Sequence, residues 1–140
     1  MMLTTKARYA IIGIIEIAES KSPKPIRLCE ISEKHGITIR YLEQIFMKLK
    51  NSGIVSAIKG PGGGYVLNTS LESLNLADII EAVGENMTMT RCSNCKSYIT
   101  AKVRCKTHNL WEGLSAHIKK YFKDISIADV INQTVVKTNV

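Results

Sequence analysis

The chain has no apolar run close to the ~20 residues that a membrane-spanning helix requires. Its most apolar stretch lies near the start, at residues 10–18, and is interrupted by Glu16. No small-residue cleavage site follows that stretch, so no secretory signal is predicted. We therefore expect a cytoplasmic protein without a membrane partner.

Recognisable catalytic arrangements are also missing. No Ser-His-Asp or Cys-His-Asn set is legible, and no carboxylate pair lies in a glycine-rich setting. The GPGGGY stretch at residues 60–65 lacks the Lys-Ser/Thr of a phosphate-binding loop and opens no helix. The sequence contains no internal repeat and no low-complexity segment. These absences favour a binding protein over an enzyme.

Positive charge is the main compositional bias. The 140 residues carry a formal net charge of +7. The first 60 residues hold ten Lys/Arg against five Glu, whereas the remaining residues hold nine Lys/Arg against seven acidic side chains. An excess of this kind fits a polyanionic partner, and most of it lies in the first half of the chain.

The first half predicts a winged helix. A helix capped by Thr4 or Thr5 is expected up to residue 20. Two shorter helices follow, at residues 28–35, closed by Gly36, and from Thr38 to Gly53. Two helices joined by a tight glycine-containing turn form a helix-turn-helix. The next residues, 54–68, place strand-type side chains on both sides of a Gly/Pro turn, which predicts a β-hairpin wing.

The second half predicts two further helices around a loop. Residues 74–85 have one apolar side, and residues 110–125 repeat apolar side chains at the spacing of an amphipathic helix. This last helix is not needed for a winged-helix core, so a dimer partner is expected to cover it. The fold class is mainly α, with predicted domains at 1–84 (winged helix-turn-helix), 85–108 (a loop that holds the Cys/His segment) and 109–140 (dimerisation helix and C-terminal tail).

The second helix of the helix-turn-helix, from Thr38 to Gly53, is the predicted recognition helix. Several polar side chains of this helix and of the wing suit double-stranded DNA. Arg40 can bond guanine, Gln44 can bond adenine, and Glu43 can accept from cytosine N4. Tyr41 and the lysines suit phosphates, while Lys59 can enter a minor groove beside glycines that permit close approach. The predicted DNA-binding residues are Thr38, Arg40, Tyr41, Glu43, Gln44, Lys48, Lys59 and Gly60.

Three of the four cysteines lie close to a histidine in the loop. Cys92 and Cys95 form a C-x2-C pair, and nine residues separate Cys95 from the Cys105/His108 pair. Cytosolic thiols stay reduced, so a metal site or a redox thiol is favoured over a structural disulfide. Spacing alone leaves zinc and an iron–sulfur cluster open. A dithiol enzyme using Cys92/Cys95 would lack the surrounding βαβ pattern of such proteins.

The sequence resembles the iron–sulfur cluster regulators of the Rrf-type winged-helix transcription factors over almost its whole length. The matching segments are LTTKARYA, ISEKHGITIRYLEQIFMKLKNSGIV, KGPGGGYVL, ADIIEAV, TRC and CKTHNLWEGLS. The resemblance implies a homodimer that binds one 2Fe–2S cluster in each subunit. It also implies that the cluster assembly machinery donates the cluster and that the protein represses or activates assembly genes.

Carried over residue by residue, the resemblance implies cluster ligands at Cys92, Cys105 and His108, with Cys95 standing for the middle cysteine. The uneven cysteine spacing departs from the family pattern. Arg40 stands where a small polar residue is usual, and Lys59 stands where Arg is usual, so the preferred DNA site can differ in detail. Two other functions stay open at this point: a zinc-stabilised winged-helix repressor without cluster sensing, and a dithiol oxidoreductase.

Overall fold

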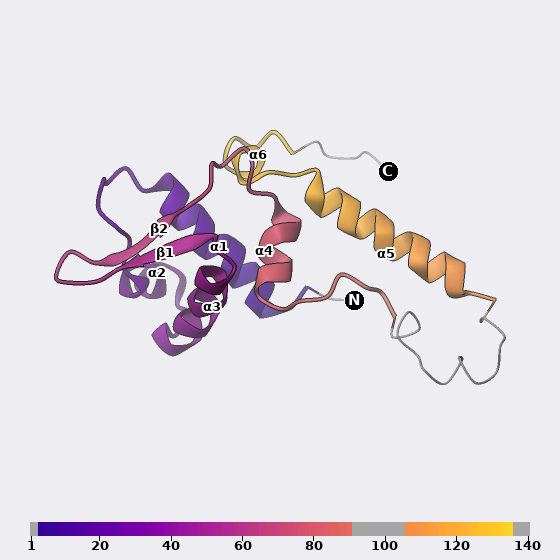
Figure 1. Cartoon of the computed structure of the whole chain (residues 1–140), viewed down its shortest axis with the longest axis horizontal. Helices are drawn as coiled ribbons and strands as arrows, with labels where there is room; N and C mark the ends of the chain where they lie inside the picture. Colours follow the sequence, from indigo (N-terminus) through magenta and orange to yellow (C-terminus); the bar gives the residue numbers. More distant parts are fainter. Residues whose placement is uncertain (1–2, 91–105, 136–140) are drawn as a thin grey trace.

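The computed structural model describes residues 3–90 and 106–135, which form a winged-helix body and one long helix that extends from it (Figure 1). No helix within these residues is long and apolar enough to span a membrane. In chain order the elements are α1 Thr5–Glu19, α2 Leu28–His35, α3 Ile39–Asn51, β1 Val55–Ile58, β2 Gly64–Leu67, α4 Leu76–Ala82, α5 His108–Lys123 and α6 Ile127–Ile131. The predicted mainly helical fold with a two-stranded wing is confirmed.

The helix-turn-helix forms where the sequence predicts it. Gly36 ends α2 with φ of 66°, in the left-handed region that glycine adopts at little cost. The inward side of α3 is fully buried, as predicted, through Leu42, Ile45, Phe46 and Leu49. A Cβ atom at Gly13 of α1 would lie 2.7 Å from the Phe46 ring. Glycine at position 13 therefore lets α1 and α3 approach closely enough to close the core.

The wing is an antiparallel hairpin that receives a third backbone segment. Val55 pairs with Leu67 and Ile58 pairs with Gly64 along the two strands. Ile26, in the stretch before α2, also exchanges two backbone hydrogen bonds with Tyr65, at 3.1 and 2.7 Å. A Cβ at Gly64 would lie 2.3 Å from the Ile26 carbonyl oxygen, so this glycine permits the pairing. Nothing in the local sequence predicted this contact.

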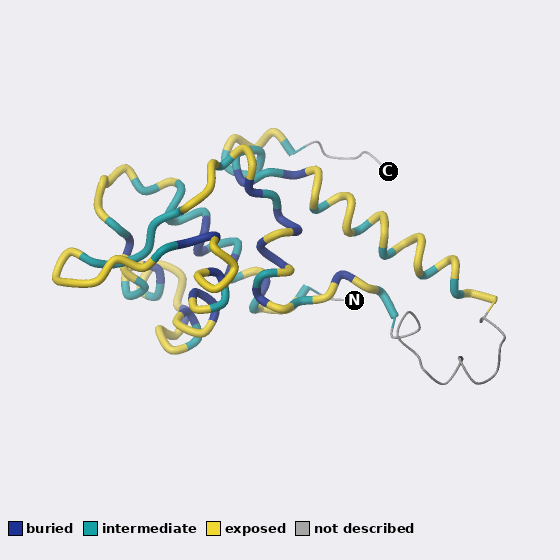
Figure 2. Tube along the Cα trace, viewed as in Figure 1, coloured by how far each residue is buried: buried dark blue, intermediate teal, exposed yellow. Residues whose placement is uncertain are grey.

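The residues after α5 return to the body. Helix α5, here called the arm, contains no buried residue (Figure 2). Its residues Ile118 and Phe122 nevertheless pack partly against the core. Ile125 and Ile127 then rejoin the core, where Leu76 N donates to Ile125 O at 3.0 Å and Ile127 N donates to Leu74 O at 2.9 Å. A capping box between Ser126 and Asp129 starts α6. Neither α6 nor the return of Ile125 and Ile127 to the core was predicted from the sequence.

Candidate nucleic-acid interface and cluster segment

The outer face of α3 carries the predicted base-reading residues. Arg40, Glu43 and Gln44 lie three and four positions apart, on one side of the helix, and all three are exposed. They occupy the first half of the second helix of a helix-turn-helix, the part that such motifs insert into the major groove. The structure thus brings these three side chains together on an accessible surface.

Tyr41 and Lys48 lie differently, because both have partners within the body. The Tyr41 ring meets the Tyr9 ring edge-on, with a centroid separation of 5.8 Å. The Lys48 ammonium donates to the Val83 carbonyl oxygen at 3.0 Å, in a partly buried position. Thr38 is exposed at the start of α3, and its side chain makes no capping bond. Phosphate contacts by these residues stay predictions.

One exposed residue on the recognition face was missed by the sequence analysis. Met47 is 55% exposed and follows Gln44 by three positions and Glu43 by four. The same spacing that grouped Arg40 with Glu43 and Gln44 would have placed it there. A large apolar side chain on this face suits the methyl group of thymine.

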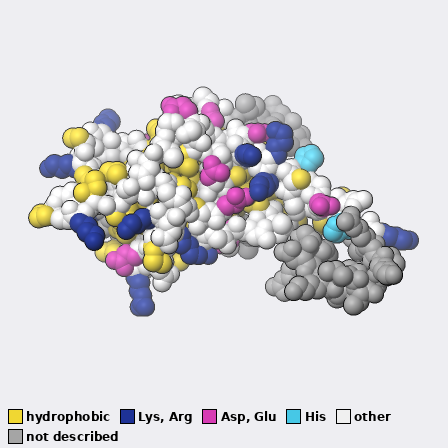
Figure 3. Space-filling model, viewed as in Figure 1, with side chains coloured by type: hydrophobic (Ala, Val, Ile, Leu, Met, Phe, Trp, Pro, Cys, Tyr) yellow, Lys and Arg dark blue, Asp and Glu magenta, His cyan; other side chains and the backbone are white. Residues whose placement is uncertain are grey.

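The wing tip presents Lys59 and Gly60 to solvent. Gly60 has φ of 106°, a conformation that side-chain-bearing residues rarely adopt. Figure 3 shows Lys and Arg side chains gathered around the wing and helix-turn-helix end, while Asp and Glu are more frequent over the middle of the same face. The wing end therefore suits a polyanion better than the middle does.

A carboxylate on α1 holds the end of α2. Glu16 accepts a hydrogen bond from Lys34 Nζ at 2.8 Å, and His35 Nε2 lies 2.8 Å from its other oxygen. Partial burial raises the pKa of Glu16, but the hydrogen bonds and charges of Lys34 and His35 outweigh it, so this pKa lies below its usual value. The charged form of Glu16 is thus the one that fastens the helix-turn-helix to α1.

Of the four predicted cluster ligands, His108 lies within the described residues. It is the first residue of α5, is half-buried, and has its Nε2 atom 3.5 Å from Glu112 Oε2. Cys92, Cys95 and Cys105 lie outside the described residues. Among residues 3–90 and 106–135, no group of three or more His, Cys, Asp or Glu side chains gathers as a metal site would.

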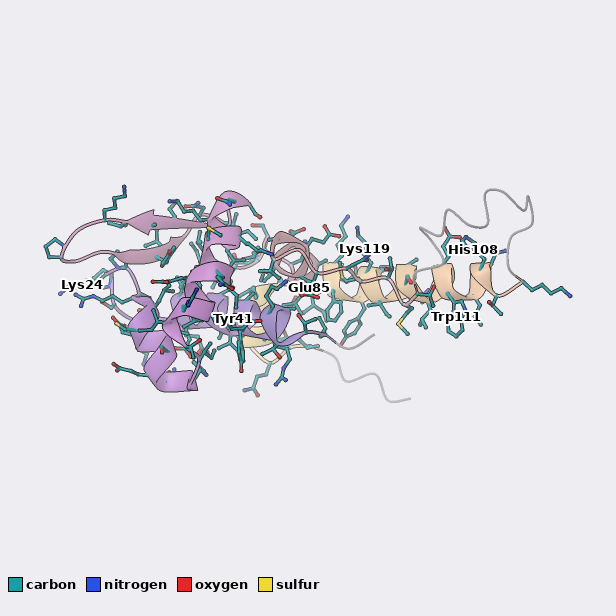
Figure 4. All side chains as sticks on the ribbon, turned by 90° about the horizontal axis from the view of Figure 1, so that it is seen from below. Lys24, Tyr41, Glu85, His108, Trp111 and Lys119 are labelled. Carbon is teal, nitrogen blue, oxygen red and sulfur yellow. The ribbon has the colours of Figure 1, made fainter. Side chains whose placement is uncertain are left out.

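His108 borders a cavity between α5 and the segment that leads toward the cysteines. This cavity measures about 380 Å³ and is also lined by Met87, Thr90, Trp111 and Ser115. Ser115 Oγ accepts a hydrogen bond from Met89 N at 2.9 Å, which joins the segment to α5. Figure 4 shows His108 and Trp111 at the far end of the arm, with Lys24 at the opposite, wing end.

The end of α4 is tied to three other elements. Glu81 forms an ion pair with Lys119 of α5 at 2.7 Å. The Val83 carbonyl oxygen accepts a hydrogen bond from Lys48 of α3. Glu85 accepts a hydrogen bond from the Thr4 hydroxyl at 2.7 Å and forms an ion pair with Lys6 at 3.2 Å. Both contacts lower the pKa of Glu85, and the hydrogen bond from Thr4 has the larger effect. Residues 81–85, just ahead of the cysteine segment, therefore contact the recognition helix, α1 and α5.

The helix-turn-helix, the wing and the exposed basic end define a winged-helix regulator that binds DNA. The Rrf2 family, described as iron-dependent transcriptional regulators, matches residues 3–133, and the chain belongs to this family. The resemblance found in the sequence is thereby confirmed.

Relatives with known names fit this assignment. The chain is 41% identical to an HTH-type transcriptional regulator of Haemophilus influenzae, over 98% of this chain and 91% of that protein. It is 38% identical to the HTH-type transcriptional regulator IscR of Yersinia enterocolitica, over 94% of this chain and 80% of the relative.

Solved structures show the same fold. CymR, the global cysteine regulator of B. subtilis, superposes with a TM-score of 0.77 at 26% identity, covering 95% of this chain and 98% of CymR. IscR of T. potens superposes with a TM-score of 0.76 at 25% identity, covering 96% of this chain and 88% of that one. These proteins are transcriptional regulators rather than enzymes, which confirms the prediction of a regulator without catalysis.

Proposed function

We propose that this Rrf2-family regulator senses the supply of iron–sulfur clusters and controls the genes of cluster assembly, acting as a cytoplasmic homodimer. The observation that carries the proposal is the position of His108. It begins α5, three residues after Cys105, with its imidazole half-buried and a carboxylate beside it. The IscR relative at 38% identity supports the same function.

The donor set fits a 2Fe–2S cluster. Cys92, Cys95 and Cys105 would supply three thiolates, and His108 would supply one imidazole nitrogen. Once bound, the cluster supplies a redox-active centre, whose potential is raised when a neutral imidazole replaces an anionic thiolate. Glu112 would orient the His108 ring on closing the present 3.5 Å separation to hydrogen-bonding distance, because histidine ligands commonly donate their second ring N–H to a carboxylate.

Residues 81–90 supply a route from the ligand segment to the DNA-binding face. They precede the cysteines directly and contact α5 through Lys119 and Ser115. They also contact the recognition helix through Lys48. Occupancy of the cluster site can change DNA affinity if it changes these contacts, since two linked sites must influence each other reciprocally.

The DNA contacts of the proposed function follow the exposed residues. Arg40, Glu43 and Gln44 read base edges, and Lys59 with Gly60 contacts the backbone or the minor groove. Thr38 and Tyr41 complete the proposed set at phosphates, and Lys48 would join them on release of its ammonium from the Val83 carbonyl. A homodimer would present two such surfaces to a double-stranded operator.

The first test is metal analysis of protein purified without oxygen. We expect visible absorption, iron and an equimolar amount of sulfide. Colourless protein containing zinc would instead support a zinc-stabilised repressor. Metal-free protein with a titratable Cys92–Cys95 disulfide would support the dithiol oxidoreductase.

Ligand variants sharpen this test. Under anaerobic reconstitution, His108→Ala and Cys95→Ala should each lose most of the cluster absorption. Cys29→Ala is the matched control, because Cys29 lies half-buried in α2, apart from the ligand segment. Full cluster retention in Cys95→Ala, or cluster loss from folded Cys29→Ala, would contradict the ligand assignment. Circular dichroism establishes that each variant is folded.

A further inference from the structure

The wing tip is fastened to the helix-turn-helix by a residue that lies far from it in the sequence. Arg27, the residue just before α2, donates from its guanidinium Nη2 to the Pro61 carbonyl oxygen at 3.0 Å. The tip also has its own turn bond, from Gly63 N to Gly60 O at 2.9 Å. Within the described part of the chain, Arg27 is the only side chain that hydrogen-bonds residues 59–63.

The base of the wing is already held at a fixed position. Ile26 pairs with Tyr65 through two backbone bonds, and the Tyr65 ring packs on Phe46 of the recognition helix with a centroid separation of 4.8 Å. From Tyr65 outward, the strands extend beyond this support, and residues 57–62 are all exposed. Arg27 therefore acts on the part of the wing that the core does not hold.

We propose that Arg27 is a positioning residue for DNA binding, which holds the wing tip so that Lys59 reaches DNA while α3 occupies the major groove. Lys59 lies two residues before the carbonyl that Arg27 binds. A tip that is already ordered loses less conformational freedom on binding than a mobile one. This inference rests on the wing contact of the proposed function.

The first measurement needs no DNA. Trypsin cleaves after Lys59, and cleavage requires the tip to open locally. Arg27→Ala should speed cleavage of the 59–60 bond by about threefold to tenfold, the range expected for loss of one exposed hydrogen bond. Arg27→Lys, which restores a charged donor, should recover most of the protection. Mass spectrometry of the first fragments isolates this bond from other tryptic sites.

Lys24→Ala is the matched control. It removes one positive charge from an exposed side chain at the same end of the molecule, as Figure 4 shows. Its cleavage rate at the 59–60 bond should equal that of the wild type. An Arg27→Ala protein that is cut no faster than Lys24→Ala would overturn the proposal.

The second measurement is a double-mutant cycle in DNA binding, with Arg27→Ala, Lys59→Ala and the pair compared at one salt concentration. If Arg27 acts through the wing, its effect on the dissociation constant should largely disappear in the Lys59→Ala background. Full additivity would show that Arg27 contacts phosphate independently, and would overturn the positioning role. If Lys59→Ala alone leaves DNA affinity unchanged, the wing contact of the proposed function fails, and this inference fails with it.

Discussion

The winged-helix body and the α5 arm bury their apolar side chains to very different extents. In the body, residues such as Ile14, Leu42, Phe46 and Ile79 have no exposed surface. In α5, a helix of 16 residues, none is buried, and Leu110 and Leu114 remain 61% and 40% exposed. A helix with an uncovered apolar face is normally stabilised by packing against something else. The core of the body is thus complete within one chain, whereas the apolar face of α5 stays exposed in this chain, as the proposed homodimer would require.

The largest expected effect comes from opening the core of the body. Phe46→Ala should lower the free energy of unfolding by about 3–5 kcal/mol, because it leaves a cavity among rigidly packed neighbours. The ring fills the space above Gly13 and contacts Tyr65, so α1 and the wing both lose a packing partner. Urea denaturation followed by circular dichroism measures the change.

Leu114→Ala is the control for this prediction. It removes an apolar side chain from the arm, where Leu114 is 40% exposed. Measured on dilute, monomeric protein, its effect on the unfolding of the body should stay within about 0.5 kcal/mol, as for surface substitutions elsewhere. Equal losses from the two variants would contradict the contrast between body and arm.

The next effect concerns assembly. Replacing Leu110 and Leu114 together by Gln should weaken the proposed homodimer by at least about tenfold, because polar side chains would then occupy the apolar face that the partner is proposed to bury. Sedimentation velocity over a range of protein concentrations gives the dissociation constant. Lys123→Gln, an exposed polar change on the same helix, is the control. An unaltered dimer in the double variant would place the interface elsewhere.

The smallest effect is a pH dependence confined to the body. Because the pKa of Glu16 is lowered in the fold, its contribution to stability is present above the usual value near 4.5 and is lost as pH falls through the folded pKa. Glu16→Gln should therefore flatten part of the stability loss between about pH 5 and pH 3. Glu19→Gln, an exposed change on the same helix, is the control.

Urea midpoints measured across that pH range test this prediction. The difference between wild type and Glu16→Gln should be largest at neutral pH, where the links to Lys34 and His35 are intact. It should shrink toward acid. A difference that stays constant with pH would show that the carboxylate charge of Glu16 does not fasten α2 to α1.

Short-range signals in the sequence were sufficient for the helix-turn-helix and the hairpin. Gly36 marks the end of α2, and Thr38 marks the start of α3. The buried face of α3 was predicted correctly from the spacing of its apolar residues, Leu42, Ile45, Phe46 and Leu49. Such signals act within a few residues, so they can be interpreted without knowing how the rest of the chain folds. The exposed set Arg40, Glu43 and Gln44 followed from the same periodicity.

Contacts between distant segments were not predictable in this way. Three contacts show this: the pairing of Ile26 with Tyr65, the return of Ile127 to the core, and the Arg27–Pro61 hydrogen bond. In each case, the sequence around one segment does not indicate which distant segment it will contact. The environment of Lys48 was also not predictable from the sequence. Its position on α3 suggested a solvent-facing cation, but its ammonium donates a hydrogen bond to the Val83 carbonyl oxygen.

Local sequence was enough to predict which residues form helices, where the wing turns, and which thiols lie close along the chain to a histidine. Periodicity, capping and spacing are local properties, and each acts over one or two turns of chain. The tertiary structure alone decided which cations are left free for DNA, how residues 25–27 support the wing, and which part of the C-terminal region belongs to the core. These outcomes depend on which surfaces meet, and that is set by burial and hydrogen bonding between segments far apart in the sequence.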